Sequence, residues 1–282
     1  MCLSMDRLDS RHREVGVRLH AVARIDTFRT HKVGADAATG RVAQVVSPYR
    51  QRGWTAESPL PDLSLVDRLF LLTHDLERGT PIIGLDILGI GLVGASLLEL
   101  TYTHCVGIWQ NGVVRRTAEY GHIDDAAQYL LGCIMEYEQN NRGGGPTVAE
   151  LIGAQRDLLY NGVAQSLAAR HMFGATFDSR RGPKGNRFIP AHGHPRIAAE
   201  ETRAWCNALF TWPQRAADAG TVALHLACLI GGLGGAPLVT AADNQTAQSN
   251  LAPLLGVCEV QHVQVIKTVS NAAGTRAMVP RR

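Results

Sequence analysis

The most apolar stretch of the chain spans residues 82–102, and its pattern predicts a buried helix. Leu88, Leu92, Ala95 and Leu98 follow a spacing of three or four residues, and other apolar residues fill the remaining faces of the same helix. A helix that is apolar on every side lies in the core of a protein, enclosed by other helices. We therefore expect one long core helix over about residues 86–104.

Glycines in this stretch admit a second interpretation. Gly89, Gly91 and Gly94 have the spacing G-x-G-x-x-G, which lets a backbone approach a pyrophosphate at a helix N-terminus. A dinucleotide-binding unit then needs a second parallel strand and an acidic residue about 20 residues further on. Here the next apolar run leads into Asn111-Gly112, which favours a type I′ turn and an antiparallel hairpin. We favour the core helix and keep a dinucleotide-dependent enzyme, using these glycines, as an alternative.

The remaining hydrophobic periodicity predicts amphipathic helices and two hairpins. The expected helices lie over residues 65–74, 121–139, 147–171, 196–210, 214–233, 244–255 and 260–273, and the expected hairpins over residues 105–114 and 172–190. The predicted fold class is therefore mainly α: a helical core surrounded by amphipathic helices, with two β-hairpins.

Composition divides the chain into a domain and two tails. Residues 1–61 show no sustained periodicity, carry ten Lys or Arg against six Asp or Glu, and end in the linker sequence Ser-Pro-Leu-Pro. This region is predicted to be a flexible, basic N-terminal tail. The helical domain is expected over residues 62–273, and residues 274–282 are expected to form a frayed C-terminal tail.

Cysteine usage and the N-terminal sequence favour a cytoplasmic protein. The six cysteines are scattered without a C-x-x-C pair, which is typical of a reducing compartment. The first thirty residues lack the apolar centre of a secretory signal. Asp86 and Glu99 lie inside the apolar stretch, and an aspartate at the centre of a bilayer costs about 2.5 to 3.5 kcal/mol, so we do not expect a membrane span.

Apart from the glycine spacing of residues 89–94, no residue pattern points to catalysis, a cofactor or a metal. The chain contains no P-loop, kinase or zinc-finger spacing and no G-x-S-x-G nucleophile motif. Asp124 and Asp125 are adjacent, so on a helix they point in different directions, and we interpret them as first-turn charges. His192 and His194 lack a further ligand at a metal-binding spacing. We predict that the protein is not an enzyme.

Basic residues are concentrated at the tip of the second expected hairpin. Arg180, Arg181, Lys184 and Arg187 lie together there, where they can meet the phosphates of lipid or nucleic acid. Each such cation contributes about 1 kcal/mol near an anionic membrane. The alternative is a solubilising tip, since charges on a hairpin also protect an edge strand from aggregation.

Five short sequence segments follow one another in an order that resembles a known family. They are residues 63–72 (LSLVDRLFLL), 91–100 (GLVGASLLEL), 167–173 (LAARHMF), Pro190 and 222–227 (VALHLA). In this order they resemble the Golgi phosphoprotein 3 family in its bacterial branch, over about residues 62–273. The resemblance implies a mostly α-helical domain that is not an enzyme. Eukaryotic members are peripheral membrane proteins that bind phosphatidylinositol 4-phosphate at the Golgi and help retain glycosyltransferases there.

The resemblance also implies a phosphate pocket, whose residues are substituted in this chain. In the family a tryptophan and an arginine flank the start of the central helix, and two arginines lie on the long helix before the second hairpin. The matching positions here are Gly84, Val93, Tyr160 and Gly162. None supplies an aromatic platform and a guanidinium group for a phosphate. The nearest replacement on the long helix is Arg156, about one turn away.

These observations predict a non-enzymatic peripheral adaptor in the cytoplasm, on the inner face of the membrane. We expect it to bind anionic phospholipid headgroups, of phosphoinositide type by the resemblance, and not nucleic acid. The expected lipid-binding residues are Arg180, Arg181, Lys184, Arg187 and Arg156. Two alternatives remain: a protein-binding scaffold that forms a homo-oligomer through the second hairpin, and the dinucleotide-dependent enzyme.

Overall fold

The computed structural model describes residues 63–109, 111–117, 123–176, 187–190, 193–240 and 244–277. The predicted N-terminal tail, the tip of the second hairpin and residues 278–282 lie outside these ranges. Over the described ranges the protein is mainly α-helical, with only small two-stranded antiparallel sheets. This architecture confirms the predicted fold class.

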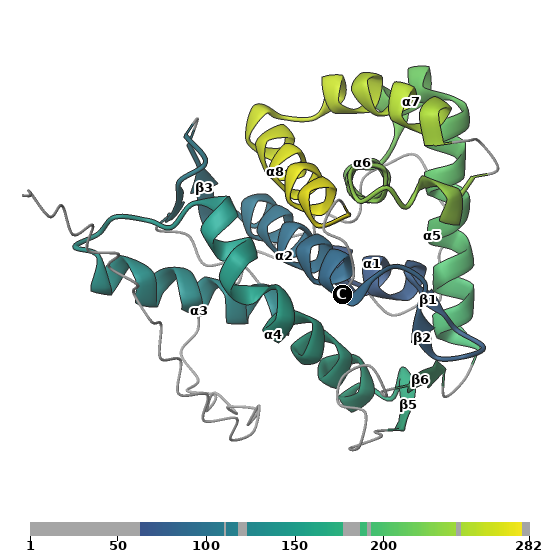
Figure 1. The fold of residues 1–282 in the computed structure, drawn as a ribbon, viewed down its shortest axis with the longest axis horizontal. Helices are drawn as coiled ribbons and strands as arrows, with labels where there is room; N and C mark the ends of the chain where they lie inside the picture. The colour runs from purple at the N-terminus through teal and green to yellow at the C-terminus, as the bar shows by residue number, and fades with distance from the viewer. Residues whose placement is uncertain are drawn as a thin grey trace, which may run out of the picture. The chain divides into compact units, whose positions relative to one another are not determined.

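The elements follow one another along the chain as Figure 1 shows. The helices are α1 (Leu65–Leu72), α2 (Leu85–Tyr102), α3 (Asp125–Asn140), α4 (Val148–Ala169), α5 (His194–Thr211), α6 (Thr221–Gly232), α7 (Asn244–Val257) and α8 (Val260–Ala277), with the 3₁₀ helices η2 (Pro213–Asp218) and η3 (Ala236–Leu238). The strands form three antiparallel pairs, β1 (His74–Asp75) with β2 (Thr80–Pro81), β3 (Val106–Ile108) with β4 (Val114–Arg116), and β5 (Phe173–Thr176) with β6 (Arg187–Pro190).

Helix α2 forms the centre of the core, as its hydrophobic pattern predicts. It packs against α1, α3, α4, α6 and α8, and every residue from Leu88 to Thr101 is buried. By length and composition this helix is apolar enough to cross a membrane, but 78% of its apolar window is buried inside the protein. Its apolar faces are therefore covered by other helices of the same chain.

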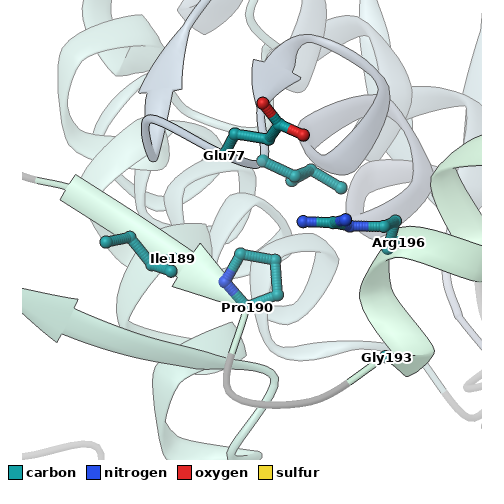
Figure 2. Close-up of a pocket in the computed structure, with 6 residues that line it drawn as sticks. Glu77, Ile189, Pro190, Gly193 and Arg196 are labelled. Atoms are coloured by element: carbon teal, nitrogen blue, oxygen red, sulfur yellow. The ribbon is translucent and has the colours of Figure 1, made fainter.

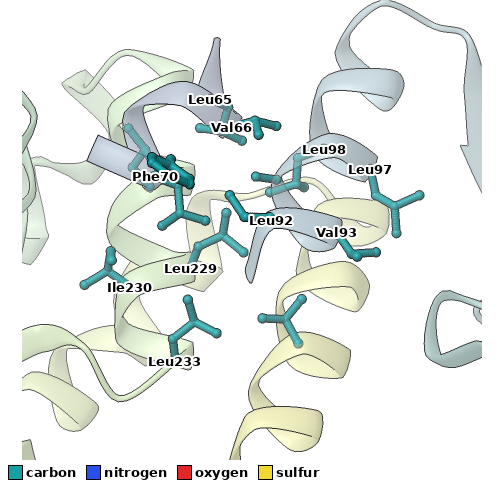
Figure 3. Packing of buried hydrophobic residues seen from close by; sticks show 14 of the residues in the cluster. Leu65, Val66, Phe70, Leu92, Val93, Leu97, Leu98, Leu229, Ile230 and Leu233 are labelled. Atoms are coloured by element: carbon teal, nitrogen blue, oxygen red, sulfur yellow. The ribbon is translucent and has the colours of Figure 1, made fainter. Parts of the chain in front are cut away.

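Side chains of α1, α2 and α6 meet in the middle of this core (Figure 3). Phe70 of α1, Leu92 of α2 and Leu229 of α6 lie close to one another in this view, and each is fully buried. Burial of one such side chain contributes about 1.5 to 3 kcal/mol relative to its exposure. The core thus links segments that are more than a hundred residues apart in the sequence.

Polar residues before the helices satisfy their first backbone amides. Ser64 and Asp67 form a capping box at α1, in which the Ser64 hydroxyl accepts from the Asp67 amide at 3.0 Å. Asp124 caps α3 by accepting from the Ala127 amide at 2.6 Å, and Asp125 lies in the first turn. Asp125 lies in the first turn of α3 as predicted, whereas Asp124 is the N-cap residue one position earlier.

The structure differs from the expected elements in two places. Two hairpins were expected, but β1 and β2 also pair after α1 and form a third hairpin. The helix expected over residues 214–233 is divided into η2 and α6, because Ala219 and Gly220 have extended backbone angles between them.

The first expected hairpin is confirmed, but its turn differs from the predicted one. The Gly112 amide donates to the Trp109 carbonyl at 2.8 Å, and Trp109 in turn donates to Val113 at 3.0 Å. A two-residue Asn-Gly turn would pair the residues directly before and after that dipeptide. The loop is therefore one residue longer than predicted, with Gly112 at a φ of 78°.

Candidate functional site

The second hairpin is attached to the loop that connects β1 and β2. The Phe188 amide of β6 donates to the Gly79 carbonyl at 2.8 Å. Gly79 has a φ of 68°, and a Cβ atom added there would lie 2.8 Å from the Phe188 nitrogen and 3.0 Å from Ile189 Cγ1. Glycine is therefore required both by the left-handed turn and by the close contact. This contact brings Arg78 next to the start of β6.

Five rings form the base of this contact: Phe70, His74, Tyr160, Phe173 and Phe188. The His74 ring stacks on Phe70 with centroids 3.9 Å apart, and Phe188 meets Phe70 edge-on at 5.7 Å. Tyr160 lies 5.6 Å from Phe70 and 6.3 Å from Phe188. Such aromatic pairs contribute about 0.5 to 1.5 kcal/mol beyond their buried area. The rings fix β5 and β6 against α1 and α4.

His74 is neutral within this cluster. Its Nδ1 lies 2.6 Å from the Phe70 carbonyl oxygen and its Nε2 lies 3.5 Å from the Tyr160 hydroxyl. Nδ1–H therefore donates to the carbonyl, while Nε2 faces the hydroxyl as an acceptor. Burial lowers the pKa of His74 to about 4, although the hydrogen bond to Phe70 opposes the shift. Burial also raises the pKa of Tyr160 to about 12.

Three arginines and two isoleucines are exposed around the attached hairpins. Arg78 follows β1, Arg187 begins β6, and Arg196 lies in the first turn of α5. Ile189 of β6 is 43% exposed and Ile197 of α5 is 54% exposed. We refer to Arg78, Arg187, Ile189, Arg196 and Ile197 as the arginine–isoleucine surface. It combines cationic groups with large apolar side chains.

A cleft of about 480 Å³ opens beside this surface. Its lining comes from the β1–β2 loop, the end of β6 and the start of α5, namely Leu76, Glu77, Ile189, Pro190, Gly193 and Arg196. Figure 2 shows Arg196 extending from α5 toward the loop that carries Glu77. The cleft thus contains one cation and one carboxylate. Outside the cleft, Arg78 Nε lies 3.7 Å from Asp75 Oδ2, and Arg187 adds a further exposed cation.

One of the five predicted lipid-binding residues belongs to this surface. Arg187 is exposed at the start of β6, where its partner across the hairpin is Thr176. Arg180, Arg181 and Lys184 lie in residues 177–186, outside the described residues. The hairpin itself, which was predicted to present them, is formed.

Arg156 has a different environment from Arg187. Its side chain is only 19% exposed, and its Nε lies 3.6 Å from Asp157 Oδ1. The buried Nε has no hydrogen-bond partner within range. Its backbone carbonyl lies against Gly89 of α2, where an added Cβ would be 2.4 Å away. Arg156 is thus held at the interface between α2 and α4 and does not line the cleft.

The four positions that match the family pocket do not form one exposed site. Gly84 precedes α2 and is half-buried, whereas Val93 lies in the middle of α2 and is fully buried. Tyr160 is 4% exposed and belongs to the aromatic cluster. Gly162 on α4 has no neighbouring atom within 4 Å of an added Cβ. A headgroup therefore has no access to Val93 or to most of the Tyr160 side chain.

A buried carboxylate network holds the start of α1 against α2. Glu99 accepts a hydrogen bond from the Leu65 amide, and Asp67 pairs with Arg170 at 2.5 Å. Burial raises the pKa of Glu99 well above its usual range, and the neighbouring charge of Asp124 adds to the shift. Burial also raises the pKa of Asp67, against the opposing effect of Arg170. These contacts give Glu99 and Asp67 a structural role at the start of α1.

The dinucleotide alternative is wrong. Gly89, Gly91 and Gly94 lie inside α2 and are buried by other helices, so their backbone has no access to a pyrophosphate. Val269 of α8 lies 2.5 Å from the Cβ position of Gly94, which shows why glycine is needed there for packing. Among the residues that the structure describes, no three of His, Cys, Asp or Glu are placed to hold a metal ion.

Sequence reasoning missed Arg78 and Arg196 as surface residues. Arg78 precedes Gly79, and an Arg-Gly pair in a short turn between apolar segments indicates an exposed loop tip. Helix α5 begins at His194, two residues before its expected start, because Pro195 suits the first turn of a helix. This earlier start places Arg196 in that turn.

Comparison with known proteins gives one result about the family. The family model described as Golgi phosphoprotein 3 (GPP34) matches residues 65–267. The matched region runs from the start of α1 into α8, and it includes both hairpins of the arginine–isoleucine surface. No curated protein matches the chain.

Proposed function

Because the chain belongs to the Golgi phosphoprotein 3 (GPP34) family, we propose that it is a non-enzymatic peripheral adaptor that docks on membranes rich in anionic phospholipid. The docking site is the arginine–isoleucine surface, extended by the basic tip of the second hairpin. Family membership supports a lipid-binding or protein-binding adaptor in general. The observation that carries the lipid assignment is the presence of exposed cations and exposed isoleucines on adjoining elements.

The chemistry of these side chains suits the interface of a membrane. Guanidinium groups form paired hydrogen bonds with phosphate oxygens. Each cation near an anionic surface contributes about 1 kcal/mol. Arg78, Arg187 and Arg196 together with Arg180, Arg181 and Lys184 supply enough charge for binding that depends strongly on salt. Ile189 and Ile197 add apolar area that the headgroup region can cover.

The charge of the membrane, and not one lipid headgroup, is the main determinant of this binding. Val93 is fully buried and Tyr160 is 4% exposed, so two of the three family positions that carry an arginine offer little or nothing to a headgroup. Arg156 is mostly buried as well. Phosphatidylglycerol, cardiolipin and phosphatidylinositol 4-phosphate should therefore support binding in proportion to their charge.

Co-sedimentation of the full chain with liposomes tests the proposal. Binding should be absent on neutral vesicles, rise with the fraction of phosphatidylglycerol or cardiolipin, and fall steeply as salt is increased. A variant with R180S, R181S, K184S and R187S should bind at least tenfold more weakly, since four cations contribute about 4 kcal/mol at most. The matched control changes four other basic residues to serine, namely Arg142, Arg215, Lys267 and Arg276. If the two variants lose the same amount of vesicle binding, the hairpin tip and the arginine–isoleucine surface are not a specific docking site.

A second variant separates membrane contact from simple charge attraction. Replacing Ile189 and Ile197 by serine removes exposed apolar side chains without changing charge. We expect weaker binding to anionic vesicles with an unchanged salt dependence. Val257 and Val260, which are 46% and 77% exposed, provide the matched control pair. If no vesicle composition binds the wild-type chain, the lipid proposal is wrong and a protein partner becomes the assignment.

A further inference from the structure

Two cysteines that the proposed function does not use lie side by side in the domain. Cys228 Sγ of α6 is 4.0 Å from Cys258 Sγ, at the junction between α7 and α8. Cys228 is fully buried, whereas Cys258 is only partly buried at the edge of the core. A disulfide requires about 2.05 Å between the sulfur atoms. The pair is therefore close enough to be joined by a small rotation of both side chains.

Hydrogen bonding gives the two thiols different roles. Cys258 Sγ lies 3.5 Å from the Leu254 carbonyl oxygen, to which its S–H donates. Because the hydrogen of Cys258 is used in that bond, the Cys228 S–H is the donor between the two thiols and the Cys258 sulfur accepts. This hydrogen bond lowers the pKa of Cys258, and it raises the pKa of Cys228 together with burial. Since the thiolate is the reactive form of cysteine, Cys258 is the nucleophile of the pair.

The two helix ends beside Cys258 act on its thiolate in opposite directions. The Glu259 carbonyl accepts from the Val263 amide at 2.9 Å, so the 18-residue helix α8 begins directly after Cys258, and its partial positive charge favours a thiolate. Cys258 Sγ also lies 3.5 Å from the Leu254 carbonyl oxygen in the last turn of α7, whose partial negative charge disfavours a thiolate. Partial exposure therefore distinguishes Cys258 from the buried Cys228 as the thiol that a peroxide reaches first.

We propose that Cys228 and Cys258 form an oxidation site for hydroperoxides, in which Cys258 is oxidised first and Cys228 resolves the product to a disulfide. The Cys258 thiolate attacks one oxygen of hydrogen peroxide and the O–O bond breaks, which gives a sulfenic acid and hydroxide; the hydroxide takes a proton to become water. The Cys228 sulfur then attacks the Cys258 sulfur, and the sulfenic oxygen leaves with the Cys228 proton as a second water. Two electrons pass from the sulfur pair to the peroxide.

Oxidation at this site would tie together two parts of the helical core. The bond would join α6 to the start of α8, and both helices pack against α2. A dithiol assignment is favoured over a metal site, because no three metal-ligating side chains come together within the described ranges. The arginine–isoleucine surface lies on other elements, so this inference does not depend on the proposed function.

Thiol mapping of the full chain tests the proposal. The reduced protein is treated with hydrogen peroxide, remaining thiols are alkylated, and peptides are identified by mass spectrometry. We expect a Cys228–Cys258 disulfide as the first product, formed faster than Cys133 is oxidised, because burial raises the pKa of the Cys133 thiol whereas the hydrogen bond from Cys228 lowers the pKa of Cys258. Reduction with a dithiol should restore both thiols.

Three variants assign the roles of the two cysteines. In Cys228→Ser, and in Cys228→Ala as a check on the buried hydroxyl, Cys258 should stop at a sulfenic acid that dimedone traps. In Cys258→Ser, Cys228 should stay reduced. Cys133→Ser, on α3, is the matched control and should leave the disulfide unchanged. Circular dichroism confirms that each variant is folded. Oxidation of Cys258 at the rate of Cys133, or rapid oxidation of Cys228 without Cys258, would overturn the proposal.

Discussion

Replacement of Gly89 by alanine tests the packing that places the central helix. Gly89 lies in α2 where the backbone of α4 comes closest. An added Cβ would be 2.4 Å from the carbonyl oxygen of Arg156 and 2.9 Å from its carbonyl carbon. Both are backbone atoms, so no side-chain rotation relieves the contact. The two helices have to separate by about 1 Å before the contact becomes an ordinary one.

Two opposed effects determine the magnitude of the change. Alanine is favoured over glycine in a helix interior by about 1 kcal/mol. Overpacking typically costs about 1 to 3 kcal/mol, and separation of α2 from α4 also weakens dispersion contacts along their whole interface. We therefore expect Gly89→Ala to lower the free energy of unfolding by about 2 kcal/mol. Because α2 contacts five other helices, this loss should affect the whole domain.

Urea unfolding followed by far-UV circular dichroism measures the effect. Gly132→Ala provides the control, because Gly132 is also inside a helix, α3, but has no atom within 4 Å of an added Cβ. This substitution should raise the free energy of unfolding by about 0.5 to 1 kcal/mol. If Gly89→Ala is as stable as Gly132→Ala, α2 and α4 do not approach as closely as the structure shows.

Three further predictions concern buried titratable groups. His74→Phe removes an imidazole whose pKa is about 4 in the folded protein. In the unfolded chain this imidazole is protonated below about pH 6.5, so the free energy of unfolding of the wild type should fall by roughly 2 kcal/mol between pH 7 and pH 5. Urea titrations should show no such fall for the variant. Glu99→Gln should be more stable than wild type at pH 8, and the difference should close toward pH 5. The raised pKa of the Glu99 carboxyl group means that the wild type loses stability as the pH rises and this group has to ionise. Parallel profiles of stability against pH for the two proteins would contradict this. A disulfide between Cys228 and Cys258 closes a loop of about 30 residues, which adds roughly 3 to 4 kcal/mol to the free energy of unfolding. Peroxide treatment should therefore raise the melting temperature of the wild type. The melting temperature of Cys258→Ser should be the same with and without peroxide.

Hydrophobic periodicity was sufficient to predict the main helices. The stretch around Leu92 is apolar on every face, and only a core position satisfies all of these faces at once. Ser64 and Thr147 each precede an acidic residue three positions later, which is a local signal for the start of a helix, and capping boxes form at both. Elements determined by short-range patterns were therefore accessible to sequence reasoning.

Features that depend on contacts distant in sequence were not predictable in this way. The strands β1 and β2 have two residues each, so their pairing depends on the hydrogen bond from Phe188 to Gly79, more than one hundred residues away in sequence. The same contact decides that Arg78 joins Arg187 on one surface. Leu158 and Leu159 are adjacent on α4, yet Leu158 is 41% exposed and Leu159 is buried, and which of them faces the core depends on how α4 packs against α2.

The burial of the family pocket positions limits how this chain can recognise a lipid. An arginine at Val93 would lie in the middle of α2, where the side chain is fully buried, and a buried charge without a partner costs several kcal/mol. Tyr160 occupies its position with a ring that packs on Phe70 and faces His74, so an arginine there would also disrupt the base of the second hairpin. Arginines at Val93 and Tyr160 would therefore disrupt the core, and an arginine at Gly162, where there is open space, would supply only one group of the family pocket. Our proposal consequently assigns membrane binding to exposed arginines, whose attraction to phosphate requires no rearrangement of the core.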